Sequence, residues 1–289
     1  MIAPGDRVAV GVSGGKDSLL LLYALALYRR FCPRPFELEA LTLTMGFEPF
    51  DLSGVRALCE RLQVPYTVRE TRIGQVIFED RKEKNPCALC AKMRRGALNE
   101  LCVQRGLNKI ALGHHRDDAL ETLLLSLFYE GRVHTFAPVT YLSRSGITQI
   151  RPLIYVPEKD IIHYARTLNL PVVPSPCPAN GYTKRQDMKE LLDFICRKIP
   201  SAREKMLSAL QNKEQYGLWD DIAASAHTMV EVNDMPKLEA AKKRRPLLER
   251  IDELGDFAEA AREGRSDVQG SYTGAPLDGE APVQDADDL

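Results

Sequence analysis

Short apolar runs with β-strand character alternate with helical patterns over the first 180 residues, and this alternation restricts the folds that the chain can adopt. Strands that alternate with helices pair in parallel, and the helices cover the sheet. We therefore predict an α/β fold with a parallel five-stranded sheet flanked by helices. The strands are expected at Arg7–Val12, Glu37–Thr44, Tyr66–Glu70, Lys109–Gly113 and Thr148–Leu153.

Two segments between these strands carry an apolar stripe with a period of about 3.6 residues, which is typical of helices that bury one face. We expect both stripes to pack against the sheet. The first consists of Val55, Leu58, Cys59 and Leu62, and the second of Leu120, Leu123, Leu124, Leu127 and Phe128.

After Pro174 the pattern predicts helices alone, at Lys184–Lys198, Ala202–Gln211 and Lys237–Glu263. From Gly264 the chain is rich in Gly, Pro, Ser, Asp and Gln, and it has too few apolar residues to offset the entropy of ordering. The sequence thus predicts three parts. They are a folded domain over residues 1–200, a helical extension over 201–263 and a disordered acidic tail over 264–289.

The charges are unevenly distributed along the chain, whose formal net charge is −1. Residues 265–289 contain one arginine and six acidic residues, a net charge of −5, so residues 1–264 carry +4. A mildly basic folded part permits contact with RNA phosphates. The basic residues that could follow an RNA backbone are Lys92, Arg94, Arg95, Lys184, Arg185 and the run Lys242–Arg245.

The sequence predicts no membrane partner. No apolar run approaches the roughly 20 residues that a membrane span needs. The amino terminus has no basic region followed by an apolar core, so we predict no secretory signal and expect a cytoplasmic location. In that setting the seven cysteines are not expected to form a disulfide framework, and close cysteine pairs point to metal or thiol chemistry.

The strongest local motif is a glycine loop between the first strand and the following helix, Ser13-Gly14-Gly15-Lys16-Asp17-Ser18. Glycines allow the backbone to approach a ligand, and the helix amino terminus adds partial positive charge, so this segment is suited to binding a phosphate. It differs from the mononucleotide P-loop and from the dinucleotide fingerprint in its glycine spacing. Lys16 would neutralise phosphate charge, and Asp17 would either assist a metal or cap the helix.

The cysteines fall into two groups. Cys87 and Cys90 stand three residues apart at the entry of a predicted helix, a spacing found in metal sites, in redox dithiols and in half of a zinc site. Cys177 lies in a proline-rich loop just after the last predicted strand, where sites form in open parallel sheets. Two paired cysteines and one distant cysteine suit an iron–sulfur cluster with one open iron. We expect Cys59, Cys102 and Cys196 to pack as small apolar side chains, and Cys32 is left without a role.

A second polar motif, Gly113-His114-His115-Arg116-Asp117-Asp118, runs from the end of a strand into a helix. The two aspartates suit the positive end of that helix, so they are expected to cap it. The two histidines at the end of the strand could equally be polar loop residues whose hydrogen bonds are satisfied. The parallel fold places this motif and the glycine loop at the same edge of the sheet.

Together these motifs resemble the tRNA 2-thiocytidine synthetase (TtcA) family of PP-loop ATP pyrophosphatases, over about residues 5–200. The resemblance rests on the SGGxDS loop, the Cys87/Cys90 pair, the Gly113–Asp118 motif, Arg151-Pro152-Leu153 with Glu158-Lys159-Asp160, and Cys177 with Lys184-Arg185-Gln186. It implies a PP-loop fold, similar to that of the adenine nucleotide alpha hydrolases.

The resemblance also implies an activity. ATP would adenylate O2 of cytidine 32 in the tRNA anticodon loop, and sulfur would replace that oxygen to give 2-thiocytidine. The implied cofactors and partners are ATP, Mg²⁺, a [4Fe–4S] cluster on Cys87, Cys90 and Cys177, a sulfur donor such as a cysteine desulfurase or sulfide, and a homodimeric assembly. The implied catalytic residues are Lys16, Asp17 and the three cysteines, and the implied nucleotide-binding residues are Ser13, Gly14, Gly15, Lys16, Asp17, Ser18, Gly113 and Asp118.

Two differences from the family pattern leave other functions open. The chain starts almost at its first strand and adds a helical, acidic carboxyl-terminal part, so we expect the RNA site to be reduced or moved. One alternative is a PP-loop sulfurtransferase that acts on another RNA base or a small molecule. The other is a non-catalytic nucleotide-binding or redox-sensing module, in which Lys16 and the cysteines would have no catalytic role.

Overall fold

The computed structural model describes residues 1–47, 50–80, 86–174, 176–177 and 184–212. Those up to Ser208 belong to one compact unit. The helix predicted at Lys237–Glu263 and the predicted disordered tail lie outside the described residues, so the division of the chain into three parts stays a prediction. Within the described ranges, no helix is both long and apolar enough to cross a membrane.

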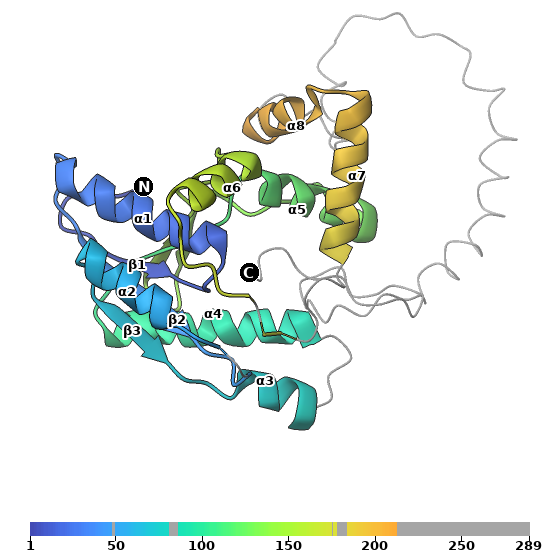
Figure 1. The fold of residues 1–289 in the computed structure, drawn as a ribbon. Helices are drawn as coiled ribbons and strands as arrows, with labels where there is room; N and C mark the ends of the chain where they lie inside the picture. The colour runs from blue at the N-terminus through green and yellow to red at the C-terminus, as the bar shows by residue number, and fades with distance from the viewer. Residues whose placement is uncertain (48–49, 81–85, 175, 178–183, 213–289) are drawn as a thin grey trace, which may run out of the picture. The chain divides into compact units, whose positions relative to one another are not determined.

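The centre of this unit is a six-stranded sheet with the order β3-β2-β1-β4-β6-β5 (Figure 1). Five strands are parallel and correspond to the five predicted ones, whereas β5 pairs antiparallel with β6. The strands are β1 (Arg7–Gly11), β2 (Glu37–Leu43), β3 (Tyr66–Arg69), β4 (Lys109–Ala111), β5 (Val139–Leu142) and β6 (Ile147–Ile150).

The predicted α/β class is therefore confirmed, and the predicted strand number is corrected from five to six. β5 escaped prediction because it is a short edge strand with a weak pattern. Its Val139 and Tyr141 are 45% and 66% exposed, so it lacks the apolar run that marks the central strands of a parallel sheet.

The helices alternate with the strands as predicted. The two helices predicted at Lys184–Lys198 and Ala202–Gln211 have the expected bounds. The helical segments are α1 (Lys16–Phe31), α2 (Ser53–Leu62), α3 (Ile73–Gln75), the π-helical segment η1 (Val76–Asp80), α4 (Pro86–Gln104), α5 (Arg116–Tyr129), α6 (Glu158–Thr167), α7 (Lys184–Lys198) and α8 (Ala202–Gln211).

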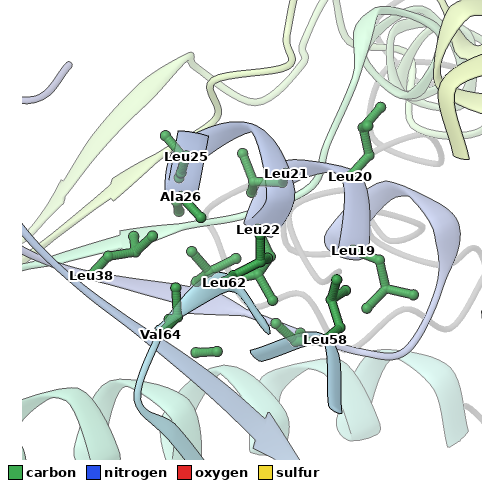
Figure 2. Close-up of a cluster of buried hydrophobic side chains, with 14 of the residues drawn as sticks. Leu19, Leu20, Leu21, Leu22, Leu25, Ala26, Leu38, Leu58, Leu62 and Val64 are labelled. Atoms are coloured by element: carbon green, nitrogen blue, oxygen red, sulfur yellow. The ribbon is translucent and has the colours of Figure 1, made fainter. Parts of the chain in front are cut away.

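One face of the sheet is covered by α1, α2 and α6, which share a large apolar core with the strands. Figure 2 shows the part of this core in which leucines of α1 meet Leu38 of β2 and Leu58 and Leu62 of α2. The predicted stripe of α2 is confirmed, since all four of its residues are buried. Because α1 is fixed along its length by this packing, its amino terminus is held at the edge of the sheet.

The opposite face of the sheet packs against α4. Ala9, Leu41 and Ile110 point to this side, where they contact Leu101 and Cys102 of α4. Successive residues of β1 thus alternate between the two faces, because Val8 and Val10 belong to the core on the other side. The sheet is consequently sandwiched between two helical layers, with α4 lying across from α1 (Figure 1).

The predicted stripe of α5 is correct only in part. Leu120 and Leu124 are buried, whereas Leu127 and Phe128 are 44% and 58% exposed. The sequence of α5 is apolar on most of its circumference, so its periodicity does not decide which face is buried. The buried residues of α5 also include Glu121 and Thr122, which face the interior together with the leucines.

The strand order contains a reversal of direction between β1 and β4. The chain moves from β1 outward through β2 and β3, and then returns to place β4 on the other side of β1. In open parallel sheets, ligands bind at the carboxyl ends of the strands where this reversal occurs. The loops that follow β1 and β4 are the glycine loop and the Gly113–Asp118 motif, so both predicted motifs lie at this position.

Candidate active site

The glycine loop connects β1 to α1 and has the backbone geometry of an anion-binding turn. Gly14 has φ of +85°, a conformation that side-chain-bearing residues rarely adopt. A Cβ atom at Gly14 would also lie 3.1 Å from Cβ of Val173. The N–H of Val173 donates to the carbonyl of Gly14 at 2.9 Å, so the segment that leads to Cys177 is bonded directly to the loop.

The two serines of the motif hold the loop in shape. The hydroxyl of Ser18 donates to the carbonyl of Gly15 at 3.0 Å and accepts from the backbone N–H of Ser13 at 3.2 Å. Gly15 is the N-cap of α1 and provides no side-chain cap. The first N–H groups of α1 therefore lie at the end of a helix dipole, where an anionic ligand is favoured.

Lys16 lies between two carboxylates. Its ammonium group is 3.0 Å from Oδ1 of Asp17 and 3.1 Å from Oε1 of Glu158, the first residue of α6. Burial alone would lower the pKa of Lys16, but the two carboxylates outweigh this effect and raise it. Lys16 is therefore a permanent cation beside the loop, as neutralisation of phosphate charge requires.

Gly113 allows the loop after β4 to approach the start of α1. A Cβ atom at this position would lie 2.9 Å from the backbone nitrogen of Ser18 and 3.0 Å from the backbone carbonyl carbon of Asp17. Both atoms belong to the first turn of α1, which the core packing holds in place. Gly113 is thus required by close contact between the two motifs rather than by its own backbone conformation.

The substitution Gly113→Ala is expected to displace the first turn of α1 and so to weaken ATP binding. Overpacking of this kind typically costs about 1–3 kcal/mol. The matched control is Gly96→Ala, because Gly96 lies within α4 with open space around it, where alanine is expected to be neutral or stabilising. Thermal unfolding and ATP titration of both variants test this prediction, which equal behaviour of the two proteins would contradict.

The Gly113–Asp118 motif forms a capping box at the start of α5. The backbone N–H of His115 donates to Oδ2 of Asp118 at 2.9 Å, and Nδ1 of His115 accepts from the backbone N–H of Asp118 at 3.3 Å. Nε2 of His115 lies 3.6 Å from Oδ1 of Asp17. The predicted capping role of Asp118 is therefore confirmed. The contact of Asp118 with a nucleotide, which the family resemblance implies, stays a prediction.

The neighbouring His114 is buried. Burial and the charge of Arg151 lower its pKa well below the ordinary value for histidine. Its ring packs against Phe136 at a tilt of 43° with a centroid distance of 4.9 Å, and the guanidinium of Arg151 lies over the same Phe136 ring at 4.8 Å. His114 is therefore neutral and supports the loop after β4 by packing.

Helix α7 contacts α5 through charged groups close to this motif. Arg185 lies 3.4 Å from Oδ1 of Asp118 and 3.6 Å from Oε2 of Glu121. Burial and the negative charge of Asp118 raise the pKa of Glu121 to about 8, although Arg185 acts in the opposite direction. Glu121 thus holds a proton in the folded protein at pH values where an exposed glutamate is ionised.

This raised pKa predicts a loss of stability with increasing pH. Between about pH 4.5 and 8 the unfolded chain has released the proton of Glu121 while the folded chain retains it, so the free energy of unfolding falls as pH rises. The variant Glu121→Gln should show a smaller decrease over this range. Denaturant unfolding at pH 5 and pH 8 measures the difference, and parallel curves for the two proteins would contradict the assignment.

Burial sets Cys59 and Cys102 apart from the other cysteines whose side chains are described. Cys59 and Cys102 are 1% and 0% exposed, and burial raises their pKa to about 11 and about 12. Neither is suited to act as a thiolate ligand, and the predicted packing role of both is confirmed. Cys196 is half-buried, so its predicted place in the core is wrong, because the side of α7 on which it lies is only partly covered.

Of the three predicted cluster ligands, the structure describes the side chains of Cys90 and Cys177. Both are half-buried. Residues 87 and 90 lie one helical turn apart at the start of α4, where the helix dipole favours a thiolate. The side chain of Cys87 is outside the described residues. Among the described side chains no group of three or more His, Cys, Asp or Glu residues could hold a metal, so the shared cluster site stays a prediction.

Three residues at this site were not assigned a role from the sequence. Glu158 and Lys189 form an ion pair at 2.8 Å beside Lys16, and Val173 bonds to the glycine loop. Of these three, Glu158 belongs to a motif that carries the family resemblance, as does Arg185 of α7. Nothing in those motifs indicates that α6 and α7 converge on the lysine of the glycine loop, because that depends on the packing of helices distant in sequence.

Comparison with known proteins places this geometry in a family. Residues 3–185 match the family model described as a PP-loop domain. The chain is 40% identical over 223 residues to the tRNA-cytidine(32) 2-sulfurtransferase of Citrifermentans bemidjiense, with coverage of 76% of this chain and 88% of the relative. It shows the same 40% identity to the enzyme of that name from Geobacter metallireducens, with 76% and 87% coverage.

Among solved structures, the U34-tRNA thiolase NcsA from Methanococcus maripaludis, determined with its [4Fe-4S] cluster, superposes with a TM-score of 0.63 and 24% identity. The match covers 76% of this chain and 78% of that one, and it supports the fold described above. The sequence matches carry the assignment further, and the region matched by the family model includes both the glycine loop and the motif after β4. The chain belongs to the PP-loop family, and within that family to the tRNA-cytidine(32) 2-sulfurtransferase group.

Proposed function

We propose that this chain is an ATP-dependent tRNA sulfurtransferase that converts cytidine 32 of the anticodon loop to 2-thiocytidine. The observation that carries the proposal is the 40% identity to tRNA-cytidine(32) 2-sulfurtransferases across 76% of the chain. It is supported by the position of the glycine loop and of Gly113 at the reversal point of the sheet.

The proposed reaction has two steps. O2 of the cytosine attacks the α-phosphorus of ATP, a new O–P bond forms, and pyrophosphate leaves. A sulfur nucleophile then attacks C2, and the C2–O bond breaks with release of AMP. Residues 13–18 would hold the phosphates through backbone N–H groups, and Lys16 would neutralise the charge that develops on the departing pyrophosphate. Mg²⁺ would share that role, and the Asp17 carboxylate, 3.0 Å from Lys16, would be a ligand for it.

The proposed cluster ligands are Cys87, Cys90 and Cys177. Cys90 and Cys177 suit the role because they are half-buried rather than enclosed in the core, unlike Cys59 and Cys102. When bound, a [4Fe–4S] cluster with three protein ligands supplies one open iron position for an added sulfur ligand. The bond from Val173 to Gly14 holds the segment before Cys177 next to the phosphate loop, so adenylation and sulfur delivery would occur at one edge of the sheet.

The remaining parts of the proposal come from the family resemblance. They are a sulfur donor that is a cysteine desulfurase or sulfide, and a homodimeric assembly. The cytoplasmic location also stays a prediction. Each is open to a direct measurement on the purified protein or in cells.

Nucleoside mass spectrometry of tRNA tests the proposal. Total tRNA from cells with and without the gene is digested, and 2-thiocytidine is quantified. We expect the nucleoside to disappear in the deletion strain and to return when the gene is supplied on a plasmid. An unchanged amount of 2-thiocytidine would reject cytidine as the substrate, and the loss of a different thionucleoside would favour another RNA base.

A further inference from the structure

We propose that Glu158 is a positioning residue that competes with ATP for Lys16, and that Lys189 of α7 controls this competition. The inference rests on the proposed binding of ATP at the glycine loop. It would make α7, which follows Cys177 in the chain, a part of the nucleotide site.

The position of Glu158 is fixed by the elements around it. It is the first residue of α6, and its backbone N–H donates to Oδ2 of Asp117 at 2.8 Å. Just before it, the carbonyl of Val156 accepts from the N–H of Arg116 at 3.1 Å. The start of α6 is therefore joined to the first turn of α5 by one bond to the Asp117 side chain and one bond between backbones. These bonds hold the Glu158 carboxylate in position beside Lys16.

Glu158 is a carboxylate at every working pH. Burial would raise its pKa, but hydrogen bonds and charges from Lys189 and Lys16 lower it to about 2. Its side chain is 17% exposed, so loss of both cations would leave a largely buried charge without compensation. A buried charge that loses its partner is strongly destabilising.

Two ammonium groups share this one carboxylate. Lys16 lies 3.1 Å from Oε1 of Glu158, and Lys189 lies 2.8 Å from Oε2. If Lys16 turns toward a phosphate, Lys189 remains as the counter-ion of Glu158. Lys16 can then exchange partners without leaving the carboxylate unpaired. Without Lys189, the movement of Lys16 toward a phosphate would break the remaining ion pair of Glu158. The free energy lost with that ion pair would weaken ATP binding.

This arrangement predicts that loss of Lys189 weakens ATP binding, whereas loss of its partner Glu158 does not. Lys189→Gln should raise the Kd for ATP about fivefold, because Glu158 then retains Lys16. Glu158→Gln should lower the Kd for ATP or leave it unchanged, because Lys16 is released, and it should lower kcat about tenfold since the ammonium is no longer aimed. The double variant should resemble Glu158→Gln, because Lys189 acts only through Glu158.

The experiment uses the full chain and measures the Kd of a non-hydrolysable ATP analogue by calorimetry, together with the kcat and KM of pyrophosphate release. Lys189→Arg retains the positive charge and should restore the wild-type Kd. Lys198→Gln, an exposed lysine at the end of the same helix, is the matched control and should leave every parameter unchanged.

The outcomes separate this inference from a structural role and from the proposed function. If the Glu158–Lys189 ion pair serves only to hold α7 against α6, both single variants will weaken ATP binding in parallel with a loss of thermal stability. That result would overturn the inference. A Kd unaffected by Lys189→Gln would overturn it as well. If the wild-type chain does not bind the ATP analogue at all, the proposed function itself is rejected.

Discussion

Lys16→Ala is expected to abolish ATP-dependent thiolation while the protein remains folded. The Lys16 ammonium would be the cation nearest the phosphates, and removal of a group that stabilises charge in the transition state typically costs about a hundredfold to a thousandfold in kcat. The fold should survive because Lys16 is partly exposed and Glu158 keeps Lys189 as its counter-ion. Pyrophosphate release and 2-thiocytidine formation on unmodified tRNA measure the loss.

The control for Lys16→Ala is Lys205→Ala, which removes an exposed lysine from α8. Wild-type rates are expected for this control, with thermal unfolding of both variants close to that of the parent protein. Retention of most of the pyrophosphate release by Lys16→Ala would show that the glycine loop does not carry the chemistry, whatever the identity of the accepting base.

Cys177→Ser should remove iron from the protein and stop thiolation while leaving ATP binding intact. A serine hydroxyl does not replace a thiolate as a cluster ligand at neutral pH, and two remaining cysteines cannot hold a cluster that needs three. Iron content and visible absorption after anaerobic reconstitution report the cluster, and titration with the ATP analogue reports the nucleotide site. We expect loss of the iron signal and an unchanged Kd for the analogue.

Cys32→Ser is the matched control for Cys177→Ser. Cys32 is also half-buried, but it follows the carboxyl end of α1, whereas the glycine loop precedes its amino end. A helix of 16 residues separates the two by about 24 Å. Cys32→Ser should therefore retain iron and activity. Equal iron content in the wild-type, Cys177→Ser and Cys32→Ser proteins would exclude Cys177 as a ligand.

The sequence predicts the sheet well because the central strands of a parallel sheet consist of apolar runs. Each predicted run lies within a few residues of the observed strand. β5 is missed because an exposed edge strand has no such run. The end of the α5 stripe is wrong for a related reason. Where leucines surround a helix, tertiary packing decides which of them is buried, and Leu127 and Phe128 are left exposed.

The glycine loop could be predicted because its chemistry is local, with backbone, helix end and lysine contained in six residues. The ion pairs of Glu158 could not, since they join α1 to α6 and α7, and more than a hundred residues of sequence separate α1 from these two helices. Similarly, the need for glycine at position 113 follows from its distance to Ser18. Such contacts are consequences of the strand order, and a single sequence does not give them.

The hydrogen bond between Val173 and Gly14 has a further consequence for Cys177, four residues later. A ligand on an untethered segment must give up conformational freedom when a metal centre forms, and this reduces the affinity. Here the fold already restricts the chain on one side of Cys177. With Cys177 as a ligand, as proposed, part of the entropic cost of cluster assembly would be met when the protein folds. For the same reason Val173→Pro, which removes the N–H that donates to Gly14, should slow cluster reconstitution although all the cysteines remain in place.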